Sequence, residues 1–292
     1  MRQSRLIRRA GVAAVGALLF ASAASAQQTV YAIGNGGSTL IRFQSNNPSD
    51  VTVVGDFGGA NFFLDAIDFR PSTGQLYGYL DSTDSFYTID LNSAQLTLAS
   101  VGASGAPTNT FQLGMDFNPS IDRLRVVTDS DQNIVFNPAA GTAAGFTNVF
   151  YTVGGPNEDT DPNLIDNAYS QNFAGAPGTQ QFAIDYGIDA LVTLANNAGT
   201  LVAVGPLGVD TDIYTGFDIA TTNSVDTGYA ILAAPGGAPS FYTIDLTSGA
   251  ATLVGAVGFT NQVYSLAVIP APGSIMLLSA ALVAGARRRQ RA

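Results

Sequence analysis

Three aspartates occupy the same place in similar short apolar segments, and they are the residues best suited to chemistry in this chain. Asp68, Asp116 and Asp218 each lie between two hydrophobic residues. Hard cations such as Ca²⁺ bind carboxylate oxygens, so these side chains would form a metal site if the fold brought them together. The alternative is a structural role, in which each Asp accepts hydrogen bonds from backbone N–H groups at the following turn.

The densest acidic segment covers residues 157–163 and contains the single Glu of the chain. Its acids, Glu158, Asp159 and Asp161, offer oxygen ligands for a second candidate calcium site. A solvated acidic loop is the alternative. Residues 129–133 open like a calcium-binding loop but lack its glycine and its final acid, which favours a hairpin turn.

Two arginines near the middle of the chain are candidate ligand-binding residues. Arg123 and Arg125 are two positions apart, so they share one face of a predicted strand. Exposed in a channel, their guanidinium groups could bind a carboxylate or a sulfate. The structural alternative is an ion pair with Asp116 or Asp122.

The composition excludes several classes of chemistry. The 292 residues include no Cys, His or Trp, and all 12 basic residues are Arg. Disulfides, cysteine nucleophiles, Ser-His-Asp triads and zinc sites with thiolate or imidazole ligands are therefore excluded. The net charge is −10 overall and −18 over residues 27–269, which contain four Arg and all 22 acids. Such an acidic chain has no electrostatic footprint for nucleic acid.

The two ends of the chain are typical of export signals. Residues 1–26 combine basic residues, an apolar run and a small-residue site ending at Ala26, which predicts a signal peptide that signal peptidase removes. Residues 270–292 combine a proline motif, an apolar run from 274 to 286 and an Arg cluster. That apolar run is shorter than the ~20 residues of a free-standing membrane helix.

The C-terminal tail resembles the PEP-CTERM class of sorting signals, which a membrane enzyme of the exosortase type reads before the tail is removed. Ala271 stands between Pro270 and Pro272 where the class has Glu. The resemblance implies delivery to the cell surface or extracellular matrix, with transient membrane anchoring by the apolar run. A plain C-terminal anchor, with the Arg cluster held on the cytoplasmic side, is the alternative.

Residues 27–269 are expected to form one domain of repeats. Residues 86–91 recur as residues 241–246, and the aspartates described above are 48 and 102 residues apart. Four short antiparallel strands fill one such unit, which is the size of a propeller blade. In the second unit, strands are expected at 64–69, 75–80, 85–91 and 95–101.

The repeats predict an all-β propeller, with five blades of four antiparallel strands as the preferred architecture. No Asp is identified in the copy expected near residue 167, and the last copy carries Ala267 in its place. The first blade starts at Thr29 without its first strand, which residues 263–269 would supply from the end of the domain. This closure leaves no open sheet edge. A β-sandwich with irregular strands is the alternative.

Several segments are similar to an exported bacterial family catalogued as domain of unknown function 4394. Residues 117–138 resemble its signature, residues 67–78 its preceding repeat and residues 199–219 its later part. The resemblance covers most of residues 29–260 and implies an exported, propeller-like protein. It brings no catalytic residues, because none is established for the family.

The sequence therefore predicts a non-enzymatic propeller at the cell surface or in the matrix. Its expected partner is a glycan such as an extracellular polysaccharide, a peptide or a surface protein. No cofactor is expected to be required, and Ca²⁺ is the candidate ion. The rival hypothesis is a glycosidase-like hydrolase, which needs two carboxylates ~5–10 Å apart across a pocket. A matrix component without a specific ligand is a third hypothesis.

Overall fold

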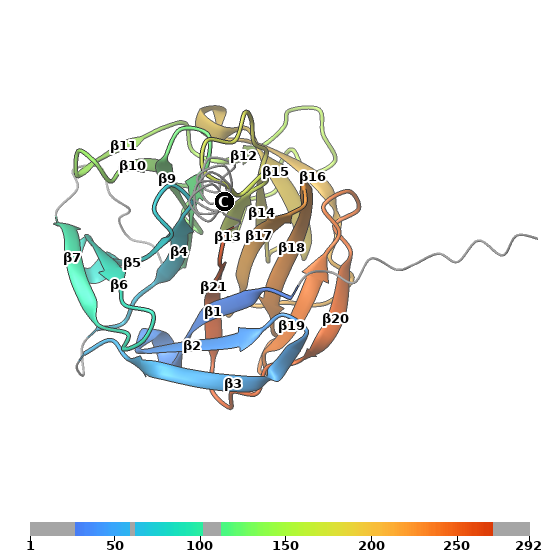
Figure 1. Cartoon of the computed structure of the whole chain (residues 1–292). Helices are drawn as coiled ribbons and strands as arrows, with labels where there is room; N and C mark the ends of the chain where they lie inside the picture. The colour runs from blue at the N-terminus through green and yellow to red at the C-terminus, as the bar shows by residue number, and fades with distance from the viewer. Residues whose placement is uncertain (1–26, 59–61, 102–111, 271–292) are drawn as a thin grey trace, which may run out of the picture.

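The strands form five sheets that stand in a ring, as Figure 1 shows. The structure is a computed structural model that describes residues 27–58, 62–101 and 112–270. It confirms the prediction of an all-β propeller with five blades. The predicted signal peptide and the predicted tail beyond Pro270 lie outside the described residues. Within the described part of the chain, no helix is long and apolar enough to cross a membrane.

Two blades follow the predicted four-stranded pattern directly. The first contains β4 (Ala66–Arg70), β5 (Gln75–Leu80), β6 (Ser85–Ile89) and β7 (Leu96–Val101). The second contains β8 (Leu113–Asn118), β9 (Arg123–Thr128), β10 (Asn133–Asn137) and β11 (Thr142–Gly145). Their turns use residues that tolerate a left-handed backbone, such as Gly74 with φ +70° and Asp84 with φ +52°.

Of the next two blades, one has the predicted four strands and the other has a fifth strand. The five-stranded blade contains β13 (Leu164–Tyr169), β14 (Gln181–Asp185), β15 (Ala190–Leu194), β16 (Thr200–Pro206) and the short β12 (Phe150–Tyr151). The added strand β12 pairs in parallel with β16. The other blade contains β17 (Gly216–Thr222), β18 (Val225–Leu232), β19 (Ser240–Ile244) and β20 (Ala251–Ala256).

The last blade closes the ring with strands from both ends of the domain. It contains β21 (Val263–Val268), β1 (Thr29–Gly34), β2 (Thr39–Gln44) and β3 (Asn47–Asp56). β21 pairs antiparallel with β1, and Val30 lies opposite Val268. This confirms the predicted closure. Three short 3-10 turns complete the structure, η1 (Asn35–Gly37), η2 (Asp81–Thr83) and η3 (Asn196–Ala198).

The hydrophobic core lies in layers between neighbouring blades rather than in one central mass. Tyr77 on β5 packs edge-on against Phe117 on β8, with ring centroids 5.1 Å apart. The innermost strands β4, β8, β13, β17 and β21 also contact their neighbours around the ring. Gly114 allows β8 to pack closely against β13, because a Cβ at this position would lie only 2.2 Å from the Cα of Asp166 on β13.

Candidate functional site

The innermost strands bring together three of the predicted metal ligands. Asp68 lies on β4, Asp116 on β8 and Asp218 on β17. One carboxylate oxygen from each lies within 4.8 Å of those of the other two. The side chains are buried, with relative exposures of 2%, 1% and 1%. These residues are referred to below as the three-aspartate cluster.

The cluster belongs to a larger cycle of hydrogen bonds that joins each blade to the next. An innermost strand has no further strand on its axial side, so side chains of the neighbouring blade must satisfy the N–H groups of that edge. In chain order, the acceptors and the residues whose N–H they bind are Asp68 with Phe117 (2.7 Å), Asp116 with Tyr169, Asp166 with Phe217 (2.8 Å), Asp218 with Val268 (2.6 Å) and Ser265 with Ile67 (3.0 Å). The cycle closes because its last link returns to the blade where it began.

Two members of this cycle were not identified from the sequence pattern. Asp166 lies on β13 just after a bulge, where the strand register shifts between Leu164 and Asp166. Its spacing alone could have revealed it, since it follows Asp116 by 50 residues and precedes Asp218 by 52. The last copy uses Ser265 rather than the position of Ala267, and this serine has φ +42° at an irregularity of β21.

Burial dominates the electrostatics of the inner strands. It raises the pKa values of Asp68 and Asp116 well above their usual range, and the charge of a neighbouring cluster carboxylate raises each further. Burial raises the pKa of Asp218 to about 7 and also raises that of Asp166. The cluster therefore carries its full negative charge near neutral pH only at a considerable cost, unless a cation compensates it.

The two candidate arginines lie in different surroundings. Arg125 is 4% exposed and donates hydrogen bonds to the Tyr169 hydroxyl (2.9 Å) and to two asparagine side chains. Arg123 is half-buried and donates to the carbonyl oxygen of Asp122 (2.9 Å). The carboxylate of Asp122 forms its ion pair with Arg70 of the preceding blade. Arg125 is thus held between the blades of β9 and β13, at a distance from solvent.

The acidic segment lies on the connection between β12 and β13, outside the three-aspartate cluster. Glu158, Asp159 and Asp161 are exposed, and Glu158 Oε2 accepts the N–H of Gly154 (2.7 Å). Asp131 on the β9–β10 hairpin is near this segment. Partial burial, with the charge of Asp161 as a further cause, raises the pKa of Asp131 to about 6.

A further perturbed carboxyl group lies at the start of the β4–β7 blade. Asp65 accepts the backbone N–H of Asp81 (2.7 Å). Burial raises the pKa of Asp65 to about 6, and the charge of Asp81 contributes to the same direction. Tyr79 and Tyr264 are the other titratable groups that interact with it electrostatically.

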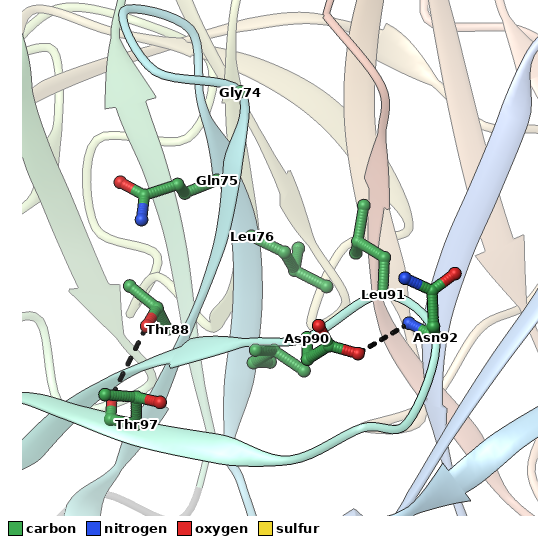
Figure 2. Close-up of a pocket in the computed structure, with 9 residues that line it drawn as sticks. Gly74, Gln75, Leu76, Thr88, Asp90, Leu91, Asn92 and Thr97 are labelled. Atoms are coloured by element: carbon green, nitrogen blue, oxygen red, sulfur yellow. Dashed lines mark hydrogen bonds between the residues drawn. The ribbon is translucent and has the colours of Figure 1, made fainter.

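The same blade carries a surface depression of about 420 Å³, drawn in Figure 2. It is lined by residues of β5, β6, β7 and the β4–β5 and β6–β7 turns: Gly74, Gln75, Leu76, Thr88, Ile89, Asp90, Leu91, Asn92 and Thr97. The side chains of Leu76 and Ile89 are buried, whereas Gln75, Asn92 and Thr97 are exposed. No sequence motif singled out this surface, because its residues are separately unremarkable and only the sheet brings them together.

The single carboxylate of the depression is engaged by its own turn. Asp90 Oδ1 accepts hydrogen bonds from the N–H of Asn92 (3.0 Å), the N–H of Ser93 (2.9 Å) and the Ser93 hydroxyl (2.8 Å). The hydroxyl of Ser93, followed by these N–H groups, lowers the pKa of Asp90. The depression therefore offers one ionised carboxylate together with amide and hydroxyl groups.

Comparison with known proteins supports the fold and identifies a family. No curated protein matches the chain. Among solved structures, a chain of the nidogen/laminin complex is 9% identical with a TM-score of 0.50, over 83% of this chain and 98% of that one. A structural genomics protein of unknown function from Bacteroides thetaiotaomicron is 13% identical with a TM-score of 0.50, over 82% and 67%.

A third similar structure is hydrazine synthase of Kuenenia stuttgartiensis, 15% identical with a TM-score of 0.42. The alignment covers 65% of this chain and 47% of the hydrazine synthase chain. This chain therefore spans about half the length of that protein. The family model for the domain of unknown function DUF4394 matches residues 39–267, which is most of the propeller. The chain therefore belongs to the family described as domain of unknown function (DUF4394).

Proposed function

We propose that the chain is an exported, non-enzymatic propeller that is held at the cell surface or in the extracellular matrix and binds a glycan there. The predicted signal peptide and the PEP-CTERM-like tail support export and surface delivery, through signal peptidase and an exosortase-like enzyme. The net charge of −18 over residues 27–269 also suits a domain exposed outside the cell, because like charge opposes self-association.

The chemistry of the depression on the β4–β7 blade is the observation that carries the binding role. The lining combines the exposed polar residues Gln75, Asn92 and Thr97 with the half-buried apolar residue Leu91. Donors and acceptors beside an apolar residue suit a polyhydroxylated ligand, whose rings have both polar edges and apolar faces. A glycan fits this surface better than an apolar molecule does.

The hydrolase hypothesis gains no support from the acids of the depression or of the inner strands. Two-carboxylate glycoside hydrolysis needs a second carboxyl group ~5–10 Å from the first, across the bound sugar. Asp90 is the single acid that lines the depression, and its Oδ1 already accepts three hydrogen bonds. The acids of the inner strands are buried and bind backbone N–H groups of the next blade.

A pair of matched variants tests the proposed site. Thr97 on β7 and Thr252 on β20 are both exposed, and each lies opposite a threonine of the repeated segment, Thr88 and Thr243. Thr97→Arg places a long side chain in the depression, whereas Thr252→Arg makes the same change on another blade. On a glycan array probed with the full chain, Thr97→Arg should weaken binding about tenfold or more, and Thr252→Arg should leave it within about twofold.

Three results would count against this proposal. Equal loss of binding in both variants would place the ligand elsewhere. Failure of the wild-type chain to bind any extracellular polysaccharide would favour the matrix component without a specific ligand. Release of reducing sugar from a bound polysaccharide would favour the glycosidase-like alternative.

A further inference from the structure

We infer that the innermost strands hold one Ca²⁺ ion between the carboxylates of Asp68, Asp116 and Asp218. This inference is independent of the glycan proposed above, because the cluster lies on the innermost strands and the depression lies on β5, β6, β7 and the adjoining turns of one blade. The three side chains come from three different blades, so an ion at this place would join β4, β8 and β17 directly.

The oxygens lie close enough together to bind one ion. One oxygen from each Asp lies within 4.8 Å of the others. Ca²⁺ binds oxygen at about 2.3–2.6 Å, so oxygens on opposite sides of one ion are about 4.6–5.2 Å apart. The ligand set is purely carboxylate, which favours a hard cation over zinc.

An unsatisfied oxygen is the second observation that points to an ion. Asp116 is 1% exposed, and its Oδ1 is buried without a hydrogen-bond partner among the described residues. A buried carboxyl oxygen without a partner is unfavourable, and native proteins rarely leave one unless an ion or a water binds it. The oxygens of Asp68 and Asp218 that accept N–H groups keep a second lone pair, so those hydrogen bonds are compatible with an ion.

The charge of the cluster also requires an explanation. Three carboxylates lie together with 1–2% exposure, and in the described part of the chain the one ion pair, Arg70 with Asp122, lies outside the cluster. A divalent cation would offset most of this charge without any basic side chain. That arrangement accounts for a domain that has only four arginines and yet buries acids around its axis.

Asp166 supplies an internal comparison within the same cycle. It is buried and links its blade to the next, yet it is not one of the three residues whose oxygens converge. Both of its oxygens accept backbone N–H groups, from Phe217 (2.8 Å) and Asn167 (2.9 Å), as both oxygens of Asp218 do. Asp116 differs, because its Oδ1 has no hydrogen-bond partner among the described residues. Asp116→Asn and Asp166→Asn therefore make the same chemical change at two positions of the cycle. Only Asp116→Asn removes a proposed Ca²⁺ ligand.

The test begins with the wild-type full chain, because a buried ion would exchange slowly. The chain is unfolded in guanidinium with a chelator, then refolded with ~1 mM Ca²⁺, with ~1 mM Mg²⁺ or without a divalent ion. Folded material is isolated in metal-free buffer, and its metal content is measured by mass spectrometry. We expect about one Ca²⁺ per chain and an unfolding midpoint that is roughly 5–10 °C higher than without the ion when Ca²⁺ is at ~100 times its Kd.

The variants then locate the ion. Asp116→Asn should lose at least about nine-tenths of the bound Ca²⁺ and the Ca²⁺-dependent shift in midpoint, whereas Asp166→Asn should keep both. Wild-type chain with less than about 0.2 Ca²⁺ and an unchanged midpoint would overturn the inference, whether or not the variants fold. Equal loss of Ca²⁺ in the two variants would also overturn it, since the ion would then depend on the cycle of hydrogen bonds and not on these ligands.

Discussion

Replacement of Gly114 by alanine should destabilise the propeller more than its small size suggests. A Cβ on Gly114 would lie 2.2 Å from the Cα of Asp166, 2.6 Å from its Oδ1 and 2.9 Å from the N of Asn167. Two of these atoms belong to the backbone of β13, so no side-chain rotation can relieve the contact. To reach an ordinary separation of about 3.4 Å, β8 and β13 must move apart by about 1.2 Å.

The expected cost is about 3 kcal/mol of unfolding free energy, because overpacking a close-packed site costs about 1–3 kcal/mol and this site cannot repack locally. For a domain of this size, that loss lowers the unfolding midpoint by roughly 6–12 °C. The separation of β8 from β13 would also disturb the hydrogen bond from Tyr169 to Asp116. The change is therefore a test of how tightly the inner strands are packed.

Gly145 provides the control for this experiment. It lies on β11 of the same blade, and a Cβ there would meet no atom within 4 Å. Gly145→Ala should change the unfolding free energy by no more than about 0.5 kcal/mol. Urea unfolding followed by far-ultraviolet circular dichroism measures both variants. If the two alanine variants agree within about 0.5 kcal/mol, the inner strands can separate freely and our account of their packing is wrong.

Three further outcomes are expected. Ser265→Ala removes the acceptor for the Ile67 N–H and should lower the unfolding free energy by about 1–3 kcal/mol in urea; no change would mean that water replaces the hydroxyl. Because the pKa of Asp65 is about 6 in the folded protein and 3.8 in the unfolded chain, its contribution to the stability falls by about 2 kcal/mol as pH rises from 4 to 6. Asp65→Asn should flatten the measured pH dependence by that amount, and an unaltered profile would contradict the assignment. Deletion of residues 270–292 should move the protein from the cell fraction to the medium on an immunoblot, whereas continued cell association would argue against a sorting tail.

The blade architecture was predictable because the sequence repeats its local signals. Residues 86–91 and 241–246 read alike, and they form β6 and β19 with their following turns. In each copy the Asp after the strand accepts N–H groups of its own turn, Asp90 in one and Asp245 in the other. Such local hydrogen bonding depends on neighbouring residues alone, so the sequence contains the information.

The cycle around the axis was only partly predictable, because its members are defined by what they bind on another blade. Asp166 keeps the spacing of the other aspartates, but polar Asn167 follows it instead of a hydrophobic residue. Ser265 performs with a hydroxyl what its counterparts perform with carboxylates. Nothing in the sequence predicts that Oδ1 of Asp116 lacks a hydrogen-bond partner. These features depend on long-range placement, which a residue pattern does not encode.

The propeller can close only when β21 pairs with β1, and β21 is the last strand of the domain. Val30 on β1 pairs with Val268 on β21, so one edge of β1 stays unpaired until nearly the whole domain has been synthesised. Contacts so distant in the chain form late and slowly. That delay would suit the export proposed above, because a chain that has not closed its ring would remain unfolded enough to cross a membrane and could complete its fold on the far side.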